Sequence, residues 1–391
     1  MFKVLLTAIN RWDSWDSSAE IPYLLKKAGC KVDIFCSDNS WLLSNKYYDK
    51  WIPIELGNVD LFAKKLIELA NTNEYQWIIL TDDIAIDLMN KKIVDEKTFL
   101  KIMPIHNIGQ RDILSSKNGF SDFCEANGIT TPLYYKYNNT DDFKLINEKL
   151  RFPVIVKPDF SWGGMGMSVN NSIDELKSTI SRMQKGENLL IQEFISGPEI
   201  GVDALFYEGI LVHFQCAKFL DYGDSKFTFS TRREYFNNDI FIDSLQEFGT
   251  KAGVHGFATI TYMFDEKSEI YYLIEVDTRP NSWFVYNRFI SKNNFSDAIK
   301  RIINGEYLNG YKAVINNKPK IEIVLFFKDI KRILIKNDII GLLKWIFNFK
   351  SCWRFLPFYD IKLTKRIFIE IGKLTILGAI FIKIKNLFRK P

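Results

Sequence analysis

Histidine and cysteine are scarce in this chain of 391 residues, and neither is spaced as in a metal site. The three histidines are scattered, and the five cysteines are odd in number and show no C-x-x-C spacing. This usage argues against a zinc or disulfide framework and predicts reduced thiols in a cytoplasmic protein. No signal peptide precedes the first expected strand, Lys3–Ile9.

Long apolar runs are lacking as well. Two apolar runs near the C-terminus, Ile339–Phe349 and Leu374–Ile382, fall well short of the ~20 residues that span a bilayer, so no transmembrane helix is expected. No G-x-G-x-x-G pattern follows the first strand, which argues against a dinucleotide site there. A hydrophobic fraction of 47% predicts a globular chain, and the length allows two or three domains.

The chain does contain a lysine at the end of an apolar strand, followed by a glycine-rich turn. The segment Phe152–Val169 reads FPVIVKPDFSWGGMGMSV, with the lysine at Lys157 and glycines at Gly163, Gly164 and Gly166. Glycine lets backbone N–H groups approach a ligand closely, and beside a lysine such groups suit a polyphosphate. A simple hairpin turn is the alternative interpretation of this motif alone.

A pair of carboxylates ends a second apolar strand, within the segment YYLIEVDTRPNSW at Tyr271–Trp283. Glu275 and Asp277 are two residues apart, so both project from one face of the strand. Such a pair suits Mg²⁺, which takes a few oxygen ligands from protein and shares the rest with substrate phosphates. Arg279 can clamp a phosphoryl group with its planar fork. A solvated strand end with a local ion pair is the alternative.

Between these motifs, Leu189–Gly201 (LLIQEFISGPEIG) contains a strand, an apolar hinge and a turn that leads to Glu199. The chain thus contains, in this order, a strand that ends in a lysine, a glycine loop, a hinge with flanking acids, and the motif E-x-D-x-R. This order of motifs resembles the ATP-grasp superfamily of ATP-dependent carboxylate–amine and carboxylate–thiol ligases. The resemblance covers roughly residues 105–290. It implies an α/β fold, in which a Rossmann-like parallel-sheet domain precedes a two-lobed α+β grasp domain.

The resemblance implies contacts to ATP from two lysines, the glycine loop, the hinge and one acid. These residues are Lys117, Lys157, Gly163, Gly164, Gly166, Glu193, Phe194, Ile195 and Glu199. In the family, the lysines contact the phosphates and the glycines form a flexible lid over them. The hinge backbone binds adenine, and the acid holds the ribose hydroxyls.

The resemblance also assigns a metal site. Glu275 and Asp277 match the ligands of Mg²⁺, with Mn²⁺ as a second possibility, and Arg279 matches an arginine that stabilises developing charge. The chain departs from the pattern at Thr261, which stands where another carboxylate or amide is usual. A threonine hydroxyl is a poor metal ligand, so this departure bears on two-metal catalysis more than on ATP binding. Asp265 is expected in a hairpin turn instead.

Residues 203–236 contain further basic candidates. The strand-like segment Gln215–Phe219 carries Lys218, and Phe227–Glu234 (FTFSTRRE) carries Arg232 and Arg233. In a grasp fold such a loop reaches the triphosphate or the acyl phosphate. Adjacent arginines point to opposite faces of a regular strand, so at most one is expected to point inward. We take Lys218 as a nucleotide-binding residue and Arg232 as the catalytic arginine.

The first 104 residues predict a parallel α/β unit, in which a helix at Ala19–Ala28 alternates with strands. The expected strands are Lys3–Ile9, Lys31–Cys36 and Trp77–Leu80. Such a sheet has a crevice at the carboxyl ends of its strands. The loop Asn10–Asp16 and the acids Asp82 and Asp83 would face the acceptor substrate there. A loop held only by its own tryptophans is the alternative.

The predicted domains are 1–104, 105–310 with a lid subdomain at about 130–195, and a basic amphipathic region at 311–391. Residues 328–391 carry 15 Lys and Arg against 4 Asp and Glu, a charge of +11 in a chain of +5. Mixed basic, apolar and aromatic residues suit an anionic membrane surface, here its inner face. Helices that pack back onto the enzyme or form a homodimer contact are the alternative. The apolar content argues against nucleic acid as a partner.

Together the motifs predict an ATP-dependent enzyme that joins a small-molecule carboxylate to an amine, less readily a thiol, and releases ADP and phosphate. The predicted catalytic residues are Lys157, Arg232 and Arg279. Two alternatives stay open: a catalytically degenerate ATP-binding regulatory module, and a membrane-surface ligase for a cell-envelope or polysaccharide precursor. The sequence does not identify the acid or the amine, because no recognisable motif marks their pockets.

Overall fold

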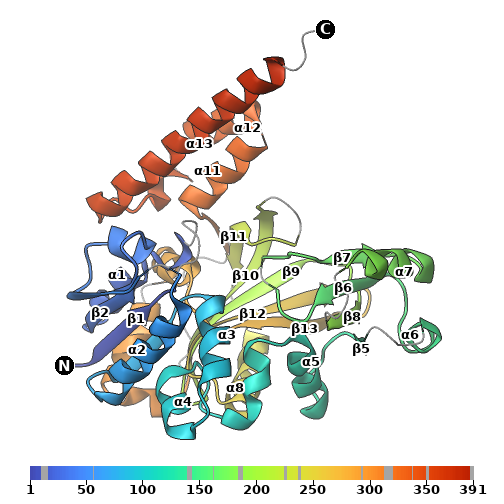
Figure 1. Ribbon diagram of the computed structural model, residues 1–391, viewed down its shortest axis with the longest axis horizontal. Helices are drawn as coiled ribbons and strands as arrows, with labels where there is room; N and C mark the ends of the chain where they lie inside the picture. The colour runs from blue at the N-terminus through green and yellow to red at the C-terminus, as the bar shows by residue number, and fades with distance from the viewer. Residues whose placement is uncertain are drawn as a thin grey trace.

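The N-terminal part of the chain forms a parallel four-stranded sheet with the order β3-β2-β1-β4 (Figure 1). The strands are β1 (Lys3–Thr7), β2 (Lys31–Cys36), β3 (Lys50–Pro53) and β4 (Trp77–Leu80). Strands β1 and β4 are buried and rich in branched apolar residues, as parallel strands covered on both faces are. The expected parallel sheet is confirmed, with β1 two residues shorter than expected and β3 an additional strand.

The structure, a computed structural model, describes residues 1–9, 16–55, 57–138, 143–161, 163–183, 188–223, 227–236, 239–291, 294–311, 320–336, 338–348 and 352–387. Of the loop Asn10–Asp16, residues 10–15 therefore lie outside the described part.

Four helices accompany the first sheet: α1 (Ile21–Lys27), α2 (Val59–Asn71), α3 (Asp83–Lys92) and α4 (Glu96–Ile102). The carboxylate of Asp82 caps α3 by accepting from the amide of Ala85, and it also accepts from the amide of Ile9 at 2.8 Å. Asp82 is buried in these contacts and has a structural role. Its neighbour Asp83 stands at the first turn of α3, at the edge of the site.

An antiparallel sheet of six strands forms the centre of the molecule, with the order β13-β12-β9-β10-β11-β14. The strands are β9 (Glu199–Tyr207), β10 (Ile210–Tyr222), β11 (Ser230–Phe236), β12 (Gly256–Asp265), β13 (Ile270–Asp277) and β14 (Lys320–Val324). Helix α8 (Ile242–Ala252) packs against β10. Residues 320–324, which fall in the region set apart as C-terminal, thus complete the central sheet.

A second antiparallel sheet forms a separate small lobe, visible on the right in Figure 1. Its strands are β5 (Tyr134–Tyr137), β6 (Val154–Pro158), β7 (Ser168–Asn170) and β8 (Leu189–Glu193), accompanied by α6 (Phe143–Lys149) and α7 (Ile173–Arg182). The lobe has its own small core, which includes Ile146, Val156, Leu176 and Ile191. It occupies most of the range expected for the lid; the division into domains stays a prediction.

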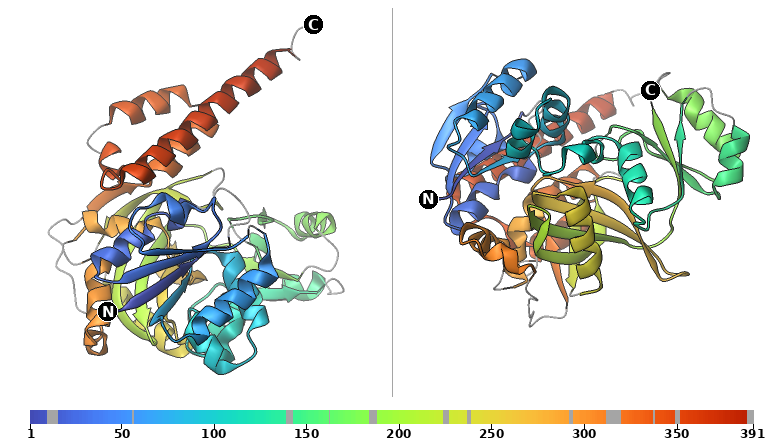
Figure 2. Two further views of the ribbon diagram at one scale, coloured as in Figure 1. Left: turned by 60° about the vertical axis from the view of Figure 1, so that its left-hand side comes forward. Right: turned by 90° about the horizontal axis from the view of Figure 1, so that it is seen from below.

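The helices α11 (Phe326–Ile335), α12 (Ile339–Phe347) and α13 (Ile361–Leu387) form a group that projects from the body (Figures 1 and 2). The first turns of α13 pack against the body of the protein, because Leu363 and Ile367 belong to the same core cluster as Trp41 of the first domain. No helix within the described residues is long and apolar enough to cross a membrane.

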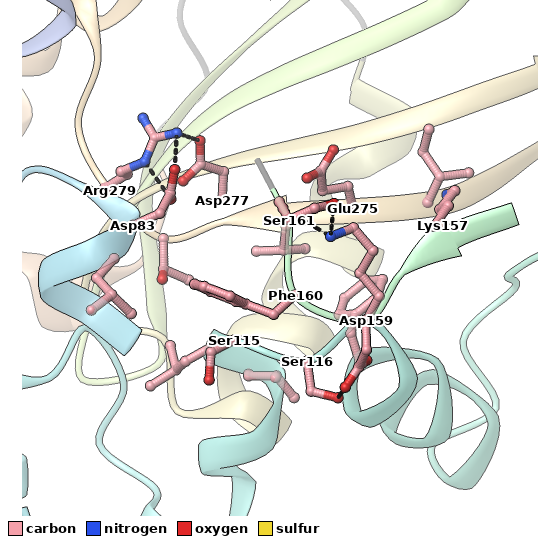
Figure 3. A pocket seen from close by; sticks show the side chains of 18 of the residues that line it. Asp83, Ser115, Ser116, Lys157, Asp159, Phe160, Ser161, Glu275, Asp277 and Arg279 are labelled. Atoms are coloured by element: carbon pink, nitrogen blue, oxygen red, sulfur yellow. Dashed lines mark hydrogen bonds and ion pairs between the residues drawn. The ribbon is translucent and has the colours of Figure 1, made fainter. Parts of the chain in front are cut away.

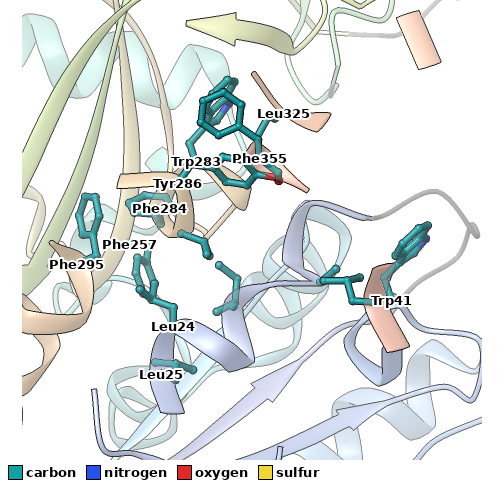
Figure 4. Packing of buried hydrophobic residues seen from close by; sticks show 14 of the residues in the cluster. Leu24, Leu25, Trp41, Phe257, Trp283, Phe284, Tyr286, Phe295, Leu325 and Phe355 are labelled. Atoms are coloured by element: carbon teal, nitrogen blue, oxygen red, sulfur yellow. The ribbon is translucent and has the colours of Figure 1, made fainter. Parts of the chain in front are cut away.

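One hydrophobic core joins the first domain, the central sheet and the C-terminal helices (Figure 4). Leu24 and Leu25 of α1 share it with Phe257 of β12 and with the short helix α9 (Ser282–Tyr286). Phe355, which precedes α13, is fully buried in the same cluster. The arrangement fixes α9, and the strand end that leads into it, relative to the first domain.

Candidate functional site

Lys157 lines a cavity between the small lobe and β13 (Figure 3). Its side chain is buried, and its Nζ donates to Oε1 of Gln192 on β8 at 2.9 Å. Burial lowers the pKa of Lys157 to about 8, with the Glu275 carboxylate acting in the opposite direction. A poorly solvated ammonium group of this kind gains strongly from an anion that enters the cavity.

Lys117 is the first residue of α5 (Lys117–Ala126) and lines the same cavity. Its Nζ donates to the carbonyl oxygen of Ser161 at 2.9 Å and to the hydroxyl of that residue at 3.2 Å. Ser116 caps the helix and donates from its hydroxyl to Asp159 at 2.9 Å. Burial lowers the pKa of Lys117. The two expected lysines therefore converge from different elements.

The three glycines of the loop after β6 adopt positive φ angles of 60° to 75°. A Cβ on Gly164 would collide with the main chain of Phe227, and one on Gly166 would come within 2.6 Å of Pro158. Gly163 lines the lysine cavity. Glycine is required here by backbone conformation and by close approach, and the loop forms one wall of the site.

The hinge after β8 lines an adjoining pocket together with Ile155, Met263 and Ile274. The amide of Glu193 donates to the carbonyl oxygen of Leu133 and that of Phe194 to Pro153, both at 2.9 Å. For the amide of Ile195 the described residues provide no acceptor. This pocket combines apolar walls with a few polar side chains and one available backbone donor, as sites for small ligands do.

Glu199 opens β9 at the edge of the hinge pocket. Its Oε2 accepts a hydrogen bond of 2.9 Å from the hydroxyl of Tyr222. Burial raises the pKa of Glu199 to about 7. The carboxyl group is therefore fixed in orientation and titrates near neutral pH.

Glu275 and Asp277 both project from β13 into the cavity, as their spacing predicts (Figure 3). In the strand pairing, Thr261 lies opposite Glu275 and Thr259 lies opposite Asp277. Both threonines line the larger cavity that continues from the site. Direct cross-strand partners share a face of the sheet, so the two carboxylates have threonine hydroxyls beside them, where the family pattern has another carboxylate or amide.

Arg279 continues the same face and binds two carboxylates. Its Nε and Nη2 donate to Asp83 at 2.6 and 2.9 Å, and its Nη2 lies 3.0 Å from Oδ2 of Asp277. Burial, together with the charges of Asp83 and Glu275, raises the pKa of Asp277, and Arg279 opposes this. Within the described residues no group of three or more His, Cys, Asp or Glu side chains is arranged for a metal ion. Two carboxylates plus phosphate oxygens still match the Mg²⁺ donor set.

The choice between the two adjacent arginines was wrong. Arg232 points away from the cavity and forms ion pairs with Asp221, Glu322 and Asp329. Arg233 lines the cavity that contains Glu275. Arg233 therefore lies on the face of β11 that is turned towards the cavity. Which of the two arginines lies on that face depends on how β11 pairs with β10 and β14.

Lys218 is also absent from the site. It is exposed on β10, whereas the next residue, Phe219, lines the cavity from the opposite face of the strand. Asp265 lies in the β12–β13 turn, as expected, and accepts from the amide of Lys267 and the hydroxyl of Ser268.

Sequence reasoning missed several residues that position the site. Gln192, which holds Lys157, immediately precedes the hinge, and Asp159, which holds Ser116, follows Lys157 by two residues. Their closeness to recognised motifs was the available signal. Lys328 and Lys331 of α11 line the larger cavity. They belong to a region whose composition predicts a membrane surface, or helices that pack back onto the enzyme, without indicating any residue of the site.

Comparison with known proteins agrees with this geometry. Residues 129–283 match the family model described as D-ala D-ala ligase C-terminus. This match and the fold shared with the solved structures below agree with the resemblance to the ATP-grasp superfamily that the motifs carry. In sequence it is 27% identical over 227 residues to the carbamoyl phosphate synthase large chain of Clostridium botulinum (strain Loch Maree / Type A3), covering 54% of this chain and 21% of that protein. The chain thus spans about a fifth of the length of this curated relative.

Solved structures with the same fold include N5-carboxyaminoimidazole synthetase from Staphylococcus aureus complexed with ADP. It has a TM-score of 0.61 and 13% identity, over 88% of this chain and 87% of that chain. L-amino acid ligase from Bacillus licheniformis has a TM-score of 0.56 and 16% identity, over 77% and 74%. The biotin carboxylase domain of Hydrogenobacter thermophilus 2-oxoglutarate carboxylase, in complex with MgADP, ADP and bicarbonate, has a TM-score of 0.56 and 18% identity, over 78% and 70%.

Proposed function

We propose that the protein is an ATP-dependent ligase, which activates a carboxylate as an acyl phosphate and joins it to an amine. The observation that carries this proposal is the meeting of Lys117 and Lys157 with Glu275 and Asp277 on one cavity. The cavity adjoins the hinge pocket, with which it shares Lys157 and Glu275. Two cations for phosphates, two carboxylates and an apolar pocket are together the requirements for Mg²⁺-ATP.

In the proposed complex adenine occupies the hinge pocket, between the carbonyl of Glu193 and the free amide of Ile195. Glu199 holds the ribose hydroxyls, and Lys117 and Lys157 contact the phosphates under the glycine loop. Glu275 and Asp277 would hold Mg²⁺ or Mn²⁺, which supplies charge neutralisation at the phosphates when bound.

The reaction has two steps. A carboxylate oxygen of the substrate attacks the γ-phosphorus, and the bond to the β-phosphate oxygen breaks to release ADP. The amine nitrogen then attacks the acyl carbon, loses a proton and displaces inorganic phosphate. Arg279 and Arg233 line the cavity and stabilise the negative charge of the acyl phosphate and of the tetrahedral intermediate. Closure of the glycine loop excludes the water that would hydrolyse the acyl phosphate.

The test is coupled measurement of ADP and phosphate release by the purified protein with Mg²⁺-ATP, against pooled carboxylates and pooled amines. A ligase releases ADP only when both pools are present, and mass spectrometry then identifies the amide. Release without an amine in the pool contradicts amide formation.

A second candidate function is favoured by Thr259 and Thr261, which face Asp277 and Glu275 where a third acid would strengthen metal binding. In this alternative the site binds ATP as a regulatory module without turnover. Tight binding of ATP with no release from any combination of pools would support it.

We also propose that the C-terminal helices attach the enzyme to an anionic membrane surface. Ile339, Ile340 and Phe347 of α12 are 72%, 68% and 73% exposed. Ile361, at the start of α13, is 79% exposed. The neighbouring residues Lys336, Lys344 and Lys362 are exposed as well. Apolar side chains next to lysines suit an interface with acidic headgroups, whereas a dimer contact would need no excess of positive charge.

A further inference from the structure

Asp159 lines the cavity that Lys117 and Lys157 share, although a carboxylate there repels the phosphates proposed for that cavity (Figure 3). It is the first residue after β6, at the start of the glycine loop. Its Oδ1 accepts from the amide of Asn118 at 2.8 Å and from the hydroxyl of Ser116 at 2.9 Å, and its Oδ2 lies 3.1 Å from the same hydroxyl. The carboxylate is therefore turned towards α5 and is held there by hydrogen bonds.

The partners of Asp159 belong to the first turn of α5. The amide of Lys117 donates to the carbonyl oxygen of Asp159 at 3.1 Å, and the amide of Asn118 donates to its carboxylate. The amide of Gly119 donates to the hydroxyl of Ser116 at 2.8 Å, which leaves that hydroxyl to donate to Asp159. The amides of this turn have no partner within the helix, so Asp159 satisfies them, and its charge complements the positive end of the helix dipole.

Asp159 also joins the body of the protein to the small lobe. Helix α5 belongs to the body, where the ring of Phe123 lies edge-on to that of Phe248 in α8, with 5.8 Å between the ring centres. Asp159 directly follows β6, a strand of the small lobe. Because Lys117 begins the helix and Lys157 lies near the end of the strand, this junction fixes how far apart the two lysines stand.

We infer that Asp159 is a positioning residue for ATP, which places Lys117 so that both lysines reach the phosphates of one nucleotide. The inference rests on the proposed function, and the partners of Asp159 in α5 precede the residues 129–283 that match the family model. Removal of Asp159 has two effects of opposite sign. The loss of a negative charge beside the phosphates strengthens ATP binding, whereas the displacement of Lys117 weakens it. We expect the displacement to prevail, because the helix dipole already offsets part of the charge of Asp159.

Calorimetry of a non-hydrolysable ATP analogue with Mg²⁺, on the full-length protein and its variants, measures the outcome. Asp159→Ala should weaken binding at least tenfold, which is about the contribution of one charge-assisted contact. Asp159→Asn keeps the oxygen that accepts from both Asn118 and Ser116, so its affinity should stay within about threefold of the wild type. Asp174→Ala removes an exposed acid from the first turn of α7 in the same lobe, and this control should bind like the wild type.

A double-mutant cycle tests whether Asp159 acts through Lys117. Lys117→Gln alone should weaken binding at least tenfold, and Asp159→Ala should add less than about threefold in that background. If Asp159 only stabilised the small lobe, the two losses would multiply. Should Asp159→Ala fail to fold, Ser116→Ala takes its place in the cycle, because it removes one partner of the carboxylate and should also weaken binding only when Lys117 is present.

Unchanged or tighter binding in Asp159→Ala, an equal loss in Asp159→Asn, or losses that multiply in the cycle would overturn the inference. Failure of the wild type to bind the analogue is a different result. It would contradict the proposed function itself, and the inference would fall with it.

Discussion

The guanidinium group of Arg279 connects the first turn of α3 with the end of β13. It donates to both carboxylate oxygens of Asp83, at 2.6 and 2.9 Å, and lies 3.0 Å from Oδ2 of Asp277. One arginine thus fixes the first domain against the strand that carries Glu275. A bidentate pair of this kind sets direction as well as distance, so the position of Asp277 depends on it.

Replacement of Arg279 by lysine should therefore impair catalysis while the protein stays folded. A lysine ammonium is a point charge and cannot pair with both oxygens of Asp83 while it contacts Asp277. We expect kcat for ADP release to fall by about 100-fold, with the Kd for ATP changed less than fivefold. Steady-state kinetics and calorimetry measure the two quantities. Lys91→Arg, which alters an exposed ion pair on α3, is the control; wild-type kcat in Arg279→Lys would contradict the role.

Arg232 and Arg233 provide a matched pair on adjacent positions of β11. Arg233→Lys should lower kcat/KM for the carboxylate substrate by at least tenfold, because only Arg233 lines the cavity. Arg232→Lys should leave kcat/KM near the wild-type value. It should lower the free energy of unfolding by about 1–3 kcal/mol, since buried Asp329 loses a partner. Denaturant titration and kinetics on both variants test this prediction. A loss of kcat/KM in Arg232→Lys but not in Arg233→Lys would show that Arg232, and not Arg233, acts on the substrate.

Glu275→Gln keeps the size of the side chain and removes its charge. We expect ADP release to fall by at least 100-fold at saturating Mg²⁺, because one of two carboxylate ligands for the cation is lost. Glu322→Gln, on the far side of the sheet in the ion pair with Arg232, is the control and should remain active. Turnover near wild type in Glu275→Gln, at any Mg²⁺ concentration, would contradict the assignment of the metal site.

The motifs predicted which residues line the cavity around Lys157 and Glu275, because local strand geometry places them. The two-residue spacing of Glu275 and Asp277 determines a shared face, and the glycines after Lys157 determine a tight turn. The face on which Arg233 lies depends on how β11 pairs with β10 and β14, which adjacent residues cannot reveal. Because side chains alternate along a strand, the sequence leaves two possible faces of β11 that could point into the cavity. Only the packing of the strand in the folded protein decides between these two faces.

The C-terminal helices show the same limit on a larger scale. Their composition indicated helices with basic and apolar residues, but not which residues of each helix meet the rest of the chain. Asp329 is fully buried and accepts hydrogen bonds from Thr231, Arg232 and Trp345. The first two of these donors are 98 and 97 residues away in sequence. Packing of this kind places Lys328 and Lys331 in the lining of a cavity, which composition alone does not indicate.

The affinity for ATP should decrease as the pH rises above 8. Burial lowers the pKa of Lys157 to about 8 in the free protein, and bound phosphate favours its protonated form. Binding above pH 8 must therefore take up a proton, at a cost of up to tenfold in affinity per pH unit. In the absence of ATP, the stability of the fold should change with pH in the opposite direction to the affinity for ATP. Between pH 8 and 10.5 the unfolded chain binds more protons at Lys157 than the folded chain does, so the free energy of unfolding rises with pH.

Calorimetric titration of an ATP analogue from pH 7 to 9.5 measures this effect. Lys157→Arg keeps its charge over the whole range, so its affinity should fall less steeply above pH 8 than that of the wild type. Lys149→Arg, a lysine of the small lobe outside the cavity, should follow the wild-type curve. A wild-type affinity independent of pH would show that Lys157 is not the phosphate-binding cation.

The C-terminal helices should bind vesicles that contain anionic lipid, and this binding should depend on the exposed apolar residues of α12. Deletion of residues 328–391 would be a poor test, because it removes buried residues such as Asp329 and Phe355. The triple variant Ile339→Ser/Ile340→Ser/Phe347→Ser leaves that core intact. We expect it to reduce binding to vesicles of phosphatidylcholine and phosphatidylglycerol at least tenfold, since each inserted side chain contributes on the order of 1 kcal/mol or more.

Vesicle flotation at low and high salt measures the binding, with pure phosphatidylcholine as the uncharged reference. Val94→Ser, at an 86% exposed position of the first domain, is the matched control and should float like the wild type. Binding should also weaken as salt increases, because lysines near an acidic surface contribute about 1 kcal/mol each and are screened. If the wild type does not float but forms a dimer in sedimentation analysis that the triple variant lacks, the α12 surface is a contact between two copies of the chain, and the membrane proposal is wrong.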